Sequence, residues 1–223
     1  MGGFRRNFVT AAAVFICLQG SVAIAEAEDA GQTDFDFYAL ALTWSPSYCA
    51  VEGENANRRQ CGADSSFGFI VHGLWPQKES GGYPEFCASS EPDRVPDKLV
   101  EQYLDIMPSA GLIGHQWRKH GSCSGFDQEG YLQTVRAARE RVKVPEAFGQ
   151  SEEARMVDPD ALEKAFLDAN PGLEATGVAV TCDQRYVREV RICMTKDLQF
   201  RACPEIDDDQ CRMDEALMPP SGG

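Results

Sequence analysis

Three histidines are the side chains of this sequence best suited to move protons near neutral pH. His72, His115 and His120 are the only histidines among 223 residues, and they lie in two short segments, FIVHGLWP and HQWRKHGSC. Imidazole both accepts and donates a proton at physiological pH. Two such rings on either side of one scissile bond would supply a base and an acid.

The second segment gathers polar side chains on one side of a predicted helix. At roughly 100° per residue, that side carries His115, Gln116, Lys119 and His120. It holds no aliphatic residue, so it makes a poor core face. A lysine and a protonated imidazole would stabilise an oxyanion, which suits attack by a ribose 2′-hydroxyl on the adjacent phosphorus.

The same two segments bear on other kinds of active site. Neither segment contains a carboxylate, which argues against a glycosidase or a two-metal nuclease centred there. A zinc site built from the three histidines stays open. Cys123 lies in the sequence GSCSG, the outline of a nucleophile elbow, which leaves a thiol hydrolase open.

The N-terminus has the pattern of a signal peptide. Arg5 and Arg6 precede a short apolar run, Val9–Leu18, and an A-x-A cleavage site follows at 23–25. We therefore expect residues 1–25 to be removed and residues 26–223 to form a single catalytic domain in the periplasm or outside the cell. No other apolar run is long enough for a membrane span, so no membrane contact is expected after cleavage.

The cysteines agree with export. Nine are present, and Cys17 lies in the predicted leader. An even number then remains, which in an exported chain favours disulfides over zinc and places Cys123 in a bridge. The remaining cysteines are Cys49, Cys61, Cys87, Cys123, Cys182, Cys193, Cys203 and Cys211.

The chain is acidic. Its net charge is −14, and without Arg5 and Arg6 the 21 basic residues become 19 against 35 acidic ones, about −16. Broad electrostatic attraction to RNA is therefore not expected, although a local basic cleft is compatible with this charge. A hydrophobic content of 43% with 25% charged residues is ordinary for a globular domain.

The order of elements predicts an α+β fold. We expect a polar loop at 45–66, another loop at 78–93 and a loose tail at 213–223. Helices are predicted from Pro96 to Met107, from Leu112 to His120, from Gln128 to Val142 and from Asp158 to Asn170. Strands are predicted at 35–44, 67–72, 177–182, 186–193 and 198–202, with His72 at a strand end.

Both histidine segments resemble the active-site segments of the ribonuclease T2 family. The match covers residues 69–76 and 115–123 and extends to 44–61 and 190–200. The resemblance implies a central antiparallel sheet flanked by helices and stapled by disulfides. It also implies metal-independent, cofactor-free cleavage of single-stranded RNA through a 2′,3′-cyclic phosphate, by a protein expected to be monomeric.

Residue roles follow from the same resemblance. His120 would be the base on the 2′-hydroxyl and His72 the acid on the 5′-oxygen. His115 would bind the phosphate, and Lys119 would stabilise the transition state. Trp75 would stack on or position a base, or pack behind the strand.

Two positions depart from the family pattern. Gln116 stands where the family usually has glutamate, so activity or its pH dependence is expected to differ, and the pKa of a neighbouring histidine to fall. Gln77 replaces a frequent aspartate, so no base preference is inferred. Gln116 and the acidic surface motivate a second hypothesis, a catalytically weakened RNA-binding or toxin-like protein on the same fold.

The resemblance also implies how the cysteines pair. The implied pairs are Cys49–Cys61, Cys87–Cys123, Cys182–Cys211 and Cys193–Cys203. The bridge Cys87–Cys123 would tie the loop after His72 to the end of the His120 segment.

Overall fold

A computed structural model describes residues 1–3 and 34–221. The described residues from 34 onward belong to one compact unit. The predicted signal peptide falls, apart from its first three residues, outside the described residues. Within the described residues, no helix has both the length and the apolar character needed to cross a membrane.

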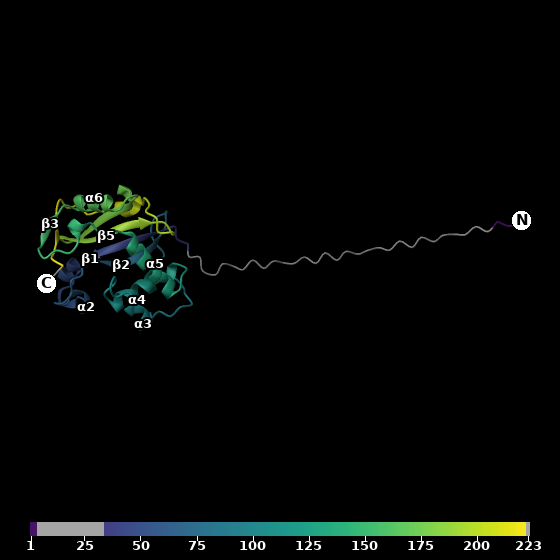
Figure 1. Cartoon of the computed structure of the whole chain (residues 1–223), viewed down its shortest axis with the longest axis horizontal. Coiled ribbons are helices and arrows are strands. Elements are labelled where there is room, and N and C mark those ends of the chain that lie inside the picture. The colour runs from purple at the N-terminus through teal and green to yellow at the C-terminus, as the bar shows by residue number, and fades with distance from the viewer. Residues whose placement is uncertain (4–33, 222–223) are drawn as a thin grey trace. The chain divides into compact units, whose positions relative to one another are not determined.

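The fold combines helices with one sheet, as predicted (Figure 1). The strands are β1 Phe37–Trp44, β2 Phe69–Gln77, β3 Arg155–Val157, β4 Val178–Asp183, β5 Tyr186–Met194 and β6 Ala216–Met218. The α-helices are α1 Ser45–Glu52, α2 Arg58–Cys61, α3 Asp97–Glu101, α4 Ala110–Lys119, α5 Gln128–Arg141, α6 Pro159–Ala169 and α7 Pro204–Asp207. Single turns of 3-10 helix lie at Gly53–Asn55, Gly121–Cys123, Glu146–Phe148 and Ala175–Gly177.

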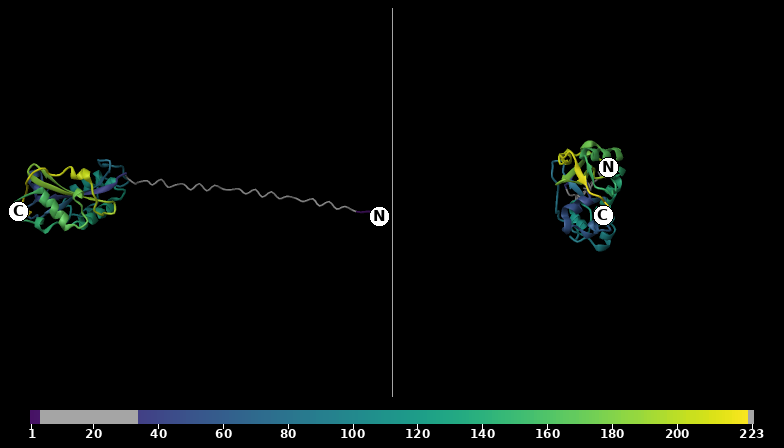
Figure 2. Two further views of the ribbon diagram at one scale, coloured as in Figure 1. Left: turned by 90° about the horizontal axis from the view of Figure 1, so that it is seen from above. Right: turned by 90° about the vertical axis from the view of Figure 1, so that its left-hand side faces the viewer.

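The sheet is built around β1 and β5. Its order is β2-β1-β5-β6-β3, and β4 pairs with β5 outside this path. The long pairings are antiparallel, and β5 meets β6 in parallel at one residue pair. In the two views of Figure 2, the yellow C-terminal segment lies against the green strands, in line with its pairing to β3 and β5. The antiparallel centre brings β2, β1 and β5 side by side, although they lie far apart in the sequence.

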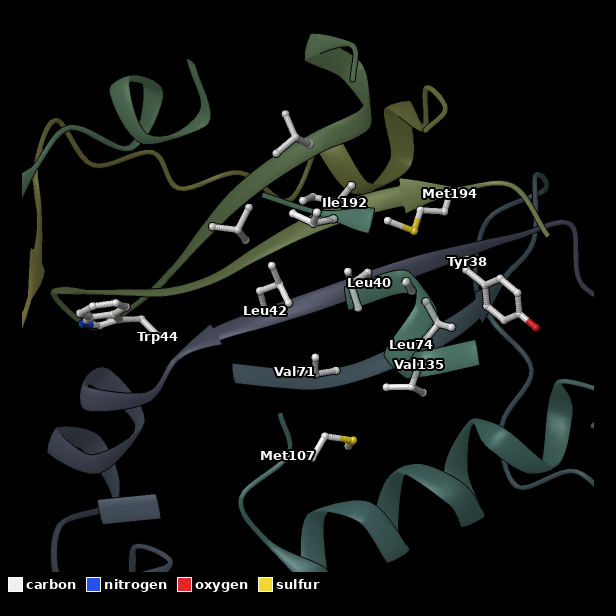
Figure 3. Close-up of a cluster of buried hydrophobic side chains, with 14 of the residues drawn as sticks. Tyr38, Leu40, Leu42, Trp44, Val71, Leu74, Met107, Val135, Ile192 and Met194 are labelled. Carbon is white, nitrogen blue, oxygen red and sulfur yellow. The ribbon is translucent and has the colours of Figure 1, made fainter. Parts of the chain in front are cut away.

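The two faces of β1 differ in the size of their side chains. Tyr38, Leu40, Leu42 and Trp44 alternate along β1 and enter the main hydrophobic core. Figure 3 shows them beside Ile192 and Met194 of β5, Val71 and Leu74 of β2, and Met107. On the other face the corresponding positions carry Phe37, Ala39, Ala41 and Thr43. Ala39, Ala41 and Thr43 are small and leave room on that face for the side chains of His72 and Trp75.

Several predicted boundaries were wrong. Residues 45–66 contain helices α1 and α2, which begin with a proline in the first turn and with an Asn57 cap, respectively. The predicted strand at 198–202 is reduced to one isolated bridge between Met194 and Phe200. The helix expected from Pro96 to Met107 keeps its α-form only over Asp97–Glu101.

The C-terminal tail is anchored, contrary to the prediction that it is loose. Ala216 and Met218 of β6 are fully buried and pair with β3, a strand that was not predicted. The Trp44 indole donates a hydrogen bond to the Pro219 carbonyl at 3.0 Å. Short strands such as β3 and β6 carry too few residues for an alternating pattern to be visible in sequence.

Candidate active site

His72 lies in the middle of β2 at a bulge, and the prediction that it ends a strand was wrong. Ala41 of β1 pairs with Gly73, and the next residue of β1 pairs with Val71, so His72 has no partner on β1. Val71 and Leu74 both enter the core although they are three residues apart. The extra residue reconciles that spacing with the period of the strand and turns His72 toward the other face.

The ring of His72 is held by a buried carboxylate from β5. Its Nδ1 lies 2.5 Å from Oε1 of Glu189, whose side chain is 1% exposed. Thr43, paired with Glu189 across the sheet, donates to the same oxygen at 3.2 Å. Glu189 was not predicted to belong to the site, because it is remote in sequence from both histidine segments. The available signal was an acidic residue within the apolar strand pattern YVREVRIC.

Helix α4 carries the second histidine segment. Ser109 caps it by accepting a hydrogen bond from the Leu112 backbone, and the helix ends at Lys119, so His120 is its C-cap residue. The four predicted polar residues do not share one environment. His115 is exposed, whereas Gln116 and His120 are 1% and 4% exposed. The expectation that this side of the helix is unsuited to burial is therefore wrong for Gln116 and His120, which face β2.

Gln116 contacts Trp75 of β2. The Trp75 indole donates to its side-chain oxygen at 2.8 Å. The contact passes over Gly73, where an added Cβ would overlap both that oxygen and the indole nitrogen. Gly73 is therefore required by the close approach of α4 to the sheet. Gln116 uses its acceptor to fix Trp75 and keeps its amide hydrogens for another partner.

Trp75 lies between two of the histidines. Its ring centroid is 5.3 Å from that of His72 and 5.5 Å from that of His120. Arg191 of β5 covers the indole at 5.5 Å. Trp75 therefore does more than pack against the strand, because its ring contacts a histidine from each of the two segments.

His120 is kept in its neutral form. Burial, followed by the positive charge of Lys119 and the neighbouring His72 and His115, lowers its pKa from 6.5 to about 3. Its Nδ1 is buried and has no hydrogen-bond partner among the described residues. The pKa of His115 is also lowered, by burial and then by Lys119 and Arg118. Both pKa values are lowered, which is the direction expected when glutamine replaces glutamate at position 116, but burial of the histidine rings is the largest cause.

Lys119 is oriented by the loop after β2. Its ammonium lies 3.4 Å from a carboxylate oxygen of Glu85 and 5.3 Å from the centroid of the Tyr83 ring. The Tyr83 ring is 5.7 Å from that of His120. Tyr83 and Glu85 belong to the loop predicted at 78–93, and neither residue was predicted to belong to the site.

A cavity of about 350 Å³ opens beside the histidines. His72, His115 and Glu189 contribute to its wall. The rest of the lining mixes aromatic, apolar and hydrogen-bonding side chains, including Tyr48, Tyr186, Leu112, Gln60 and Arg188. A cavity of this kind admits a planar polar ring next to the proposed reaction centre.

The cysteines form four disulfides. Cys123 is bonded to Cys87, which ties the loop after β2 to the end of the His120 segment. A thiol hydrolase at Cys123 is therefore wrong, because its sulfur is committed to a bridge. The bridges Cys49–Cys61, Cys87–Cys123, Cys182–Cys211 and Cys193–Cys203 are the pairs that the family resemblance implies.

The zinc alternative finds no support in the geometry. Over residues 1–3 and 34–221, no group of three or more His, Cys, Asp or Glu side chains is placed to hold a metal ion. The three histidines are close enough to influence each other electrostatically, yet they do not converge on one point as zinc ligands do.

Relatives with related sequences are ribonucleases. A ribonuclease of Aeromonas hydrophila is 34% identical over 168 residues, which cover 74% of this chain and 74% of that protein. Ribonuclease I of Escherichia coli (strain K12) is 26% identical over 239 residues, covering 88% of each.

Solved structures share the fold. An RNase-related protein from Calystegia sepium superposes with a TM-score of 0.65 at 21% identity, covering 83% of this chain and 97% of that one. RNase NT, solved in complex with 5′-AMP, gives 0.62 at 22% identity, covering 84% and 99%. The model of the ribonuclease T2 family matches residues 35–203. The chain therefore belongs to the ribonuclease T2 family and is an RNA endonuclease.

Proposed function

We propose that the protein cleaves single-stranded RNA without a metal ion, by attack of the ribose 2′-hydroxyl on the adjacent phosphorus. The product of this step is a 2′,3′-cyclic phosphate, which water then opens more slowly. The observation that carries the proposal is that His72, His115 and Lys119 lie close enough to His120 to shift its pKa, while Trp75 contacts both His72 and His120.

His120 is the proposed base. With a pKa of about 3 its ring is neutral at physiological pH and has a lone pair to accept the 2′-hydroxyl proton. A pKa this low makes a weak base in the free protein. Binding of a phosphodiester brings a negative charge beside the ring, which raises the pKa of His120 toward the working range.

The other three groups act on the phosphate and the leaving group. His72 is the proposed acid that protonates the departing 5′-oxygen. Lys119 stabilises the charge that develops on the phosphoryl oxygens, and His115 binds the phosphate in the ground state. The Gln116 amide hydrogens are proposed to assist by donating to a phosphoryl oxygen, since its acceptor is occupied by Trp75.

Trp75 is proposed to hold an unpaired base at the edge of the site. Aromatic side chains stack on bases that are not paired, which favours single strands over duplexes. The related RNase NT was solved in complex with 5′-AMP, which is compatible with a nucleotide site of this kind. The cavity beside His72 is proposed to receive a neighbouring base of the same strand.

Product analysis of a short RNA of mixed sequence, with and without EDTA, tests the reaction. We expect the same cyclic-phosphate products in both samples and no cleavage of the matching DNA. Loss of activity in EDTA, equal cleavage of DNA, or RNA binding without turnover would each contradict the proposal. The last outcome would support the weakened RNA-binding hypothesis.

Substitutions test the assignment of roles. His72→Ala and His120→Ala are each expected to lower kcat by at least about 10²-fold, the scale of acid–base groups. Arg118→Ala is the matched control, because this exposed cation lies on the same helix but outside the proposed machinery. Near-normal histidine variants would refute the roles.

We also propose that the protein is exported, as a monomer with residues 26–223 as its mature domain. All eight cysteines after the predicted leader are paired, which fits an oxidising compartment. N-terminal sequencing of the protein recovered from the periplasm or the medium should begin at Glu26. Light scattering should give the mass of one chain.

A further inference from the structure

Glu189 is an unusual residue for the position it occupies in the sheet. Its side chain is 1% exposed, and Val187 and Val190 of the same strand are wholly buried. Taking a carboxylate out of water costs several kcal/mol unless charged or hydrogen-bonding partners compensate. A buried acid that touches one of the proposed catalytic histidines therefore requires a functional explanation.

The partners of Glu189 come from three strands. Its Oε1 contacts His72 Nδ1 at 2.5 Å, Thr43 Oγ1 at 3.2 Å and Arg188 Nε at 3.9 Å, and its Oε2 lies 3.3 Å from Arg191 Nε. Burial alone would raise the pKa of Glu189. The hydrogen bond and charge of His72, with the two arginines, lower it instead to about 2. The carboxylate is therefore ionised throughout the neutral and mildly acidic range.

This contact determines which nitrogen of the His72 ring is free. A carboxylate accepts hydrogen bonds and does not donate them, so Nδ1 of His72 carries the hydrogen of this pair. Nε2 is then the nitrogen left for a substrate. The ring meets Trp75 edge-on at 83°, and His72 lines the cavity together with His115. The bulge in β2 turns the side chain toward this face, and Glu189 fixes the rotation of its ring.

We propose that Glu189 is a positioning residue for His72, aiming Nε2 at the scissile phosphodiester and compensating the positive charge of the ring. This inference rests on the proposed function. As the bond between phosphorus and the 5′-oxygen breaks, Nε2 of protonated His72 gives its proton to that oxygen. The ring becomes neutral, with its Nδ1 hydrogen still directed at Glu189. In the hydrolysis step the neutral Nε2 takes a proton from the water that attacks phosphorus, the bond between phosphorus and the 2′-oxygen breaks, and protonated His120 returns its proton to that oxygen, which restores the starting state.

The surrounding charges allow this role to be isolated. Arg191 also pairs with exposed Asp209 at 3.0 Å, and Arg188 lies 3.6 Å from Asp183. Both arginines therefore keep a carboxylate partner when Glu189 is neutralised. Glu189→Gln mainly changes what His72 experiences. Asp209→Asn is the matched control, since it removes a charge from an arginine without touching His72.

The decisive comparison varies the leaving group. One substrate is a dinucleoside monophosphate, whose 5′-alkoxide must be protonated as it departs. The other is a nucleoside 3′-(p-nitrophenyl phosphate), whose phenolate departs without a proton. We expect Glu189→Gln to lower kcat on the dinucleoside monophosphate by about 10- to 10²-fold. This loss is no larger than the lower end of the range seen when a general acid or base is itself removed. On the second substrate and in KM we expect little change, and the Asp209→Asn control should resemble the wild type on both substrates.

A purely structural role would give a different pattern. Equal slowing of both substrates by Glu189→Gln would overturn the proposal. So would a further loss when Glu189→Gln is added to His72→Ala, because a residue that acts through His72 has no effect once that ring is gone. If Glu189→Gln fails to fold, Glu189→Asp keeps the charge but withdraws it from His72, and it should show the same dependence on the leaving group. If the wild type itself forms no cyclic phosphate from the dinucleotide, the proposed function fails rather than the role of Glu189.

Discussion

The hydrogen bond between Trp75 and Gln116 joins the strand and the helix that carry the proposed catalytic groups, and its strength can be measured. The indole nitrogen lies 2.8 Å from the amide oxygen, and Gln116 is 1% exposed. Gln116→Leu leaves the indole N–H without its acceptor, and Trp75→Phe leaves the amide oxygen without its donor. Each single substitution should therefore cost the desolvation of one unpaired polar group, about 1–3 kcal/mol.

The double substitution removes both groups at once. It should cost less than the sum of the two single changes by about 1–2 kcal/mol, because no unpaired polar group remains. The lost apolar contact of the larger indole ring, including its contact with Arg191, occurs in both legs of the cycle and cancels. Urea unfolding with the disulfides intact, followed by far-ultraviolet circular dichroism, gives the four free energies of unfolding. This probe is preferable to fluorescence, because one variant removes a tryptophan.

A coupling below about 0.5 kcal/mol would refute this reasoning, since distant, independent sites add to within that range. Gln116→Glu is the matched control. It keeps an acceptor for the indole, so Trp75→Phe should cost about as much in its background as in the wild type, and the coupling in this cycle should be close to zero, although burial penalises the charged form of the new side chain. An equally large coupling in the Gln116→Glu and Gln116→Leu cycles would show that the oxygen acceptor is irrelevant.

Three further changes test other parts of the site. Gly73→Ala should break the same contact by steric overlap and lower both stability and kcat, which unfolding and dinucleotide assays would detect; wild-type values for both would be incompatible with the close approach. The double variant Cys87→Ser/Cys123→Ser opens a bridge of sequence separation 36, and the chain-entropy relation gives about 4 kcal/mol of lost stability, measurable by urea unfolding. Stability should also fall as pH drops from 6.5 toward about 3, by up to about 1.4 kcal/mol per pH unit from His120, whose pKa is lower in the folded state. Glu189, with an ordinary pKa of 4.5 and a folded pKa of about 2, adds to this loss only below about pH 4.5. His120→Gln should flatten the profile between pH 6.5 and about 3 and leave only the contribution of Glu189 below about pH 4.5.

Local patterns predicted the parts of the fold that local physics determines. The cap at Asp158 followed by Pro159 begins α6 as expected, and Asp158 accepts from the Asp160 backbone at 2.9 Å. The alternation of β1 and the apolar run of β5 correspond to the two central strands. These elements depend on neighbours in sequence, so their patterns are visible in one chain.

The features that were missed depend on contacts between distant segments. The bulge at His72 follows from how β1 pairs with β2, and no residue type at position 72 signals it. Glu189 meets His72 only because β5 lies on the other side of β1, 117 residues along the chain. The burial of Gln116 and His120 reflects the packing of α4 on β2 over Gly73, which a helical wheel does not contain.

The sheet gives the two proposed proton-transfer histidines different surroundings. His120 follows a helix that packs closely over Gly73, is almost fully buried and lies beside Lys119, so its environment favours the neutral ring that a base requires. His72 stands at a bulge beside an ionised carboxylate, which accepts the Nδ1 hydrogen and leaves Nε2 for the leaving group, as the proposed acid requires. The opposite roles proposed for two identical side chains thus follow from their positions: one under a helix with a neighbouring cation, the other over small strand residues with a neighbouring anion. Neutralising both groups, with Glu189→Gln and Lys119→Gln in one chain, should therefore make the surroundings of the two rings more alike and slow cleavage of the dinucleotide, even though every histidine is retained.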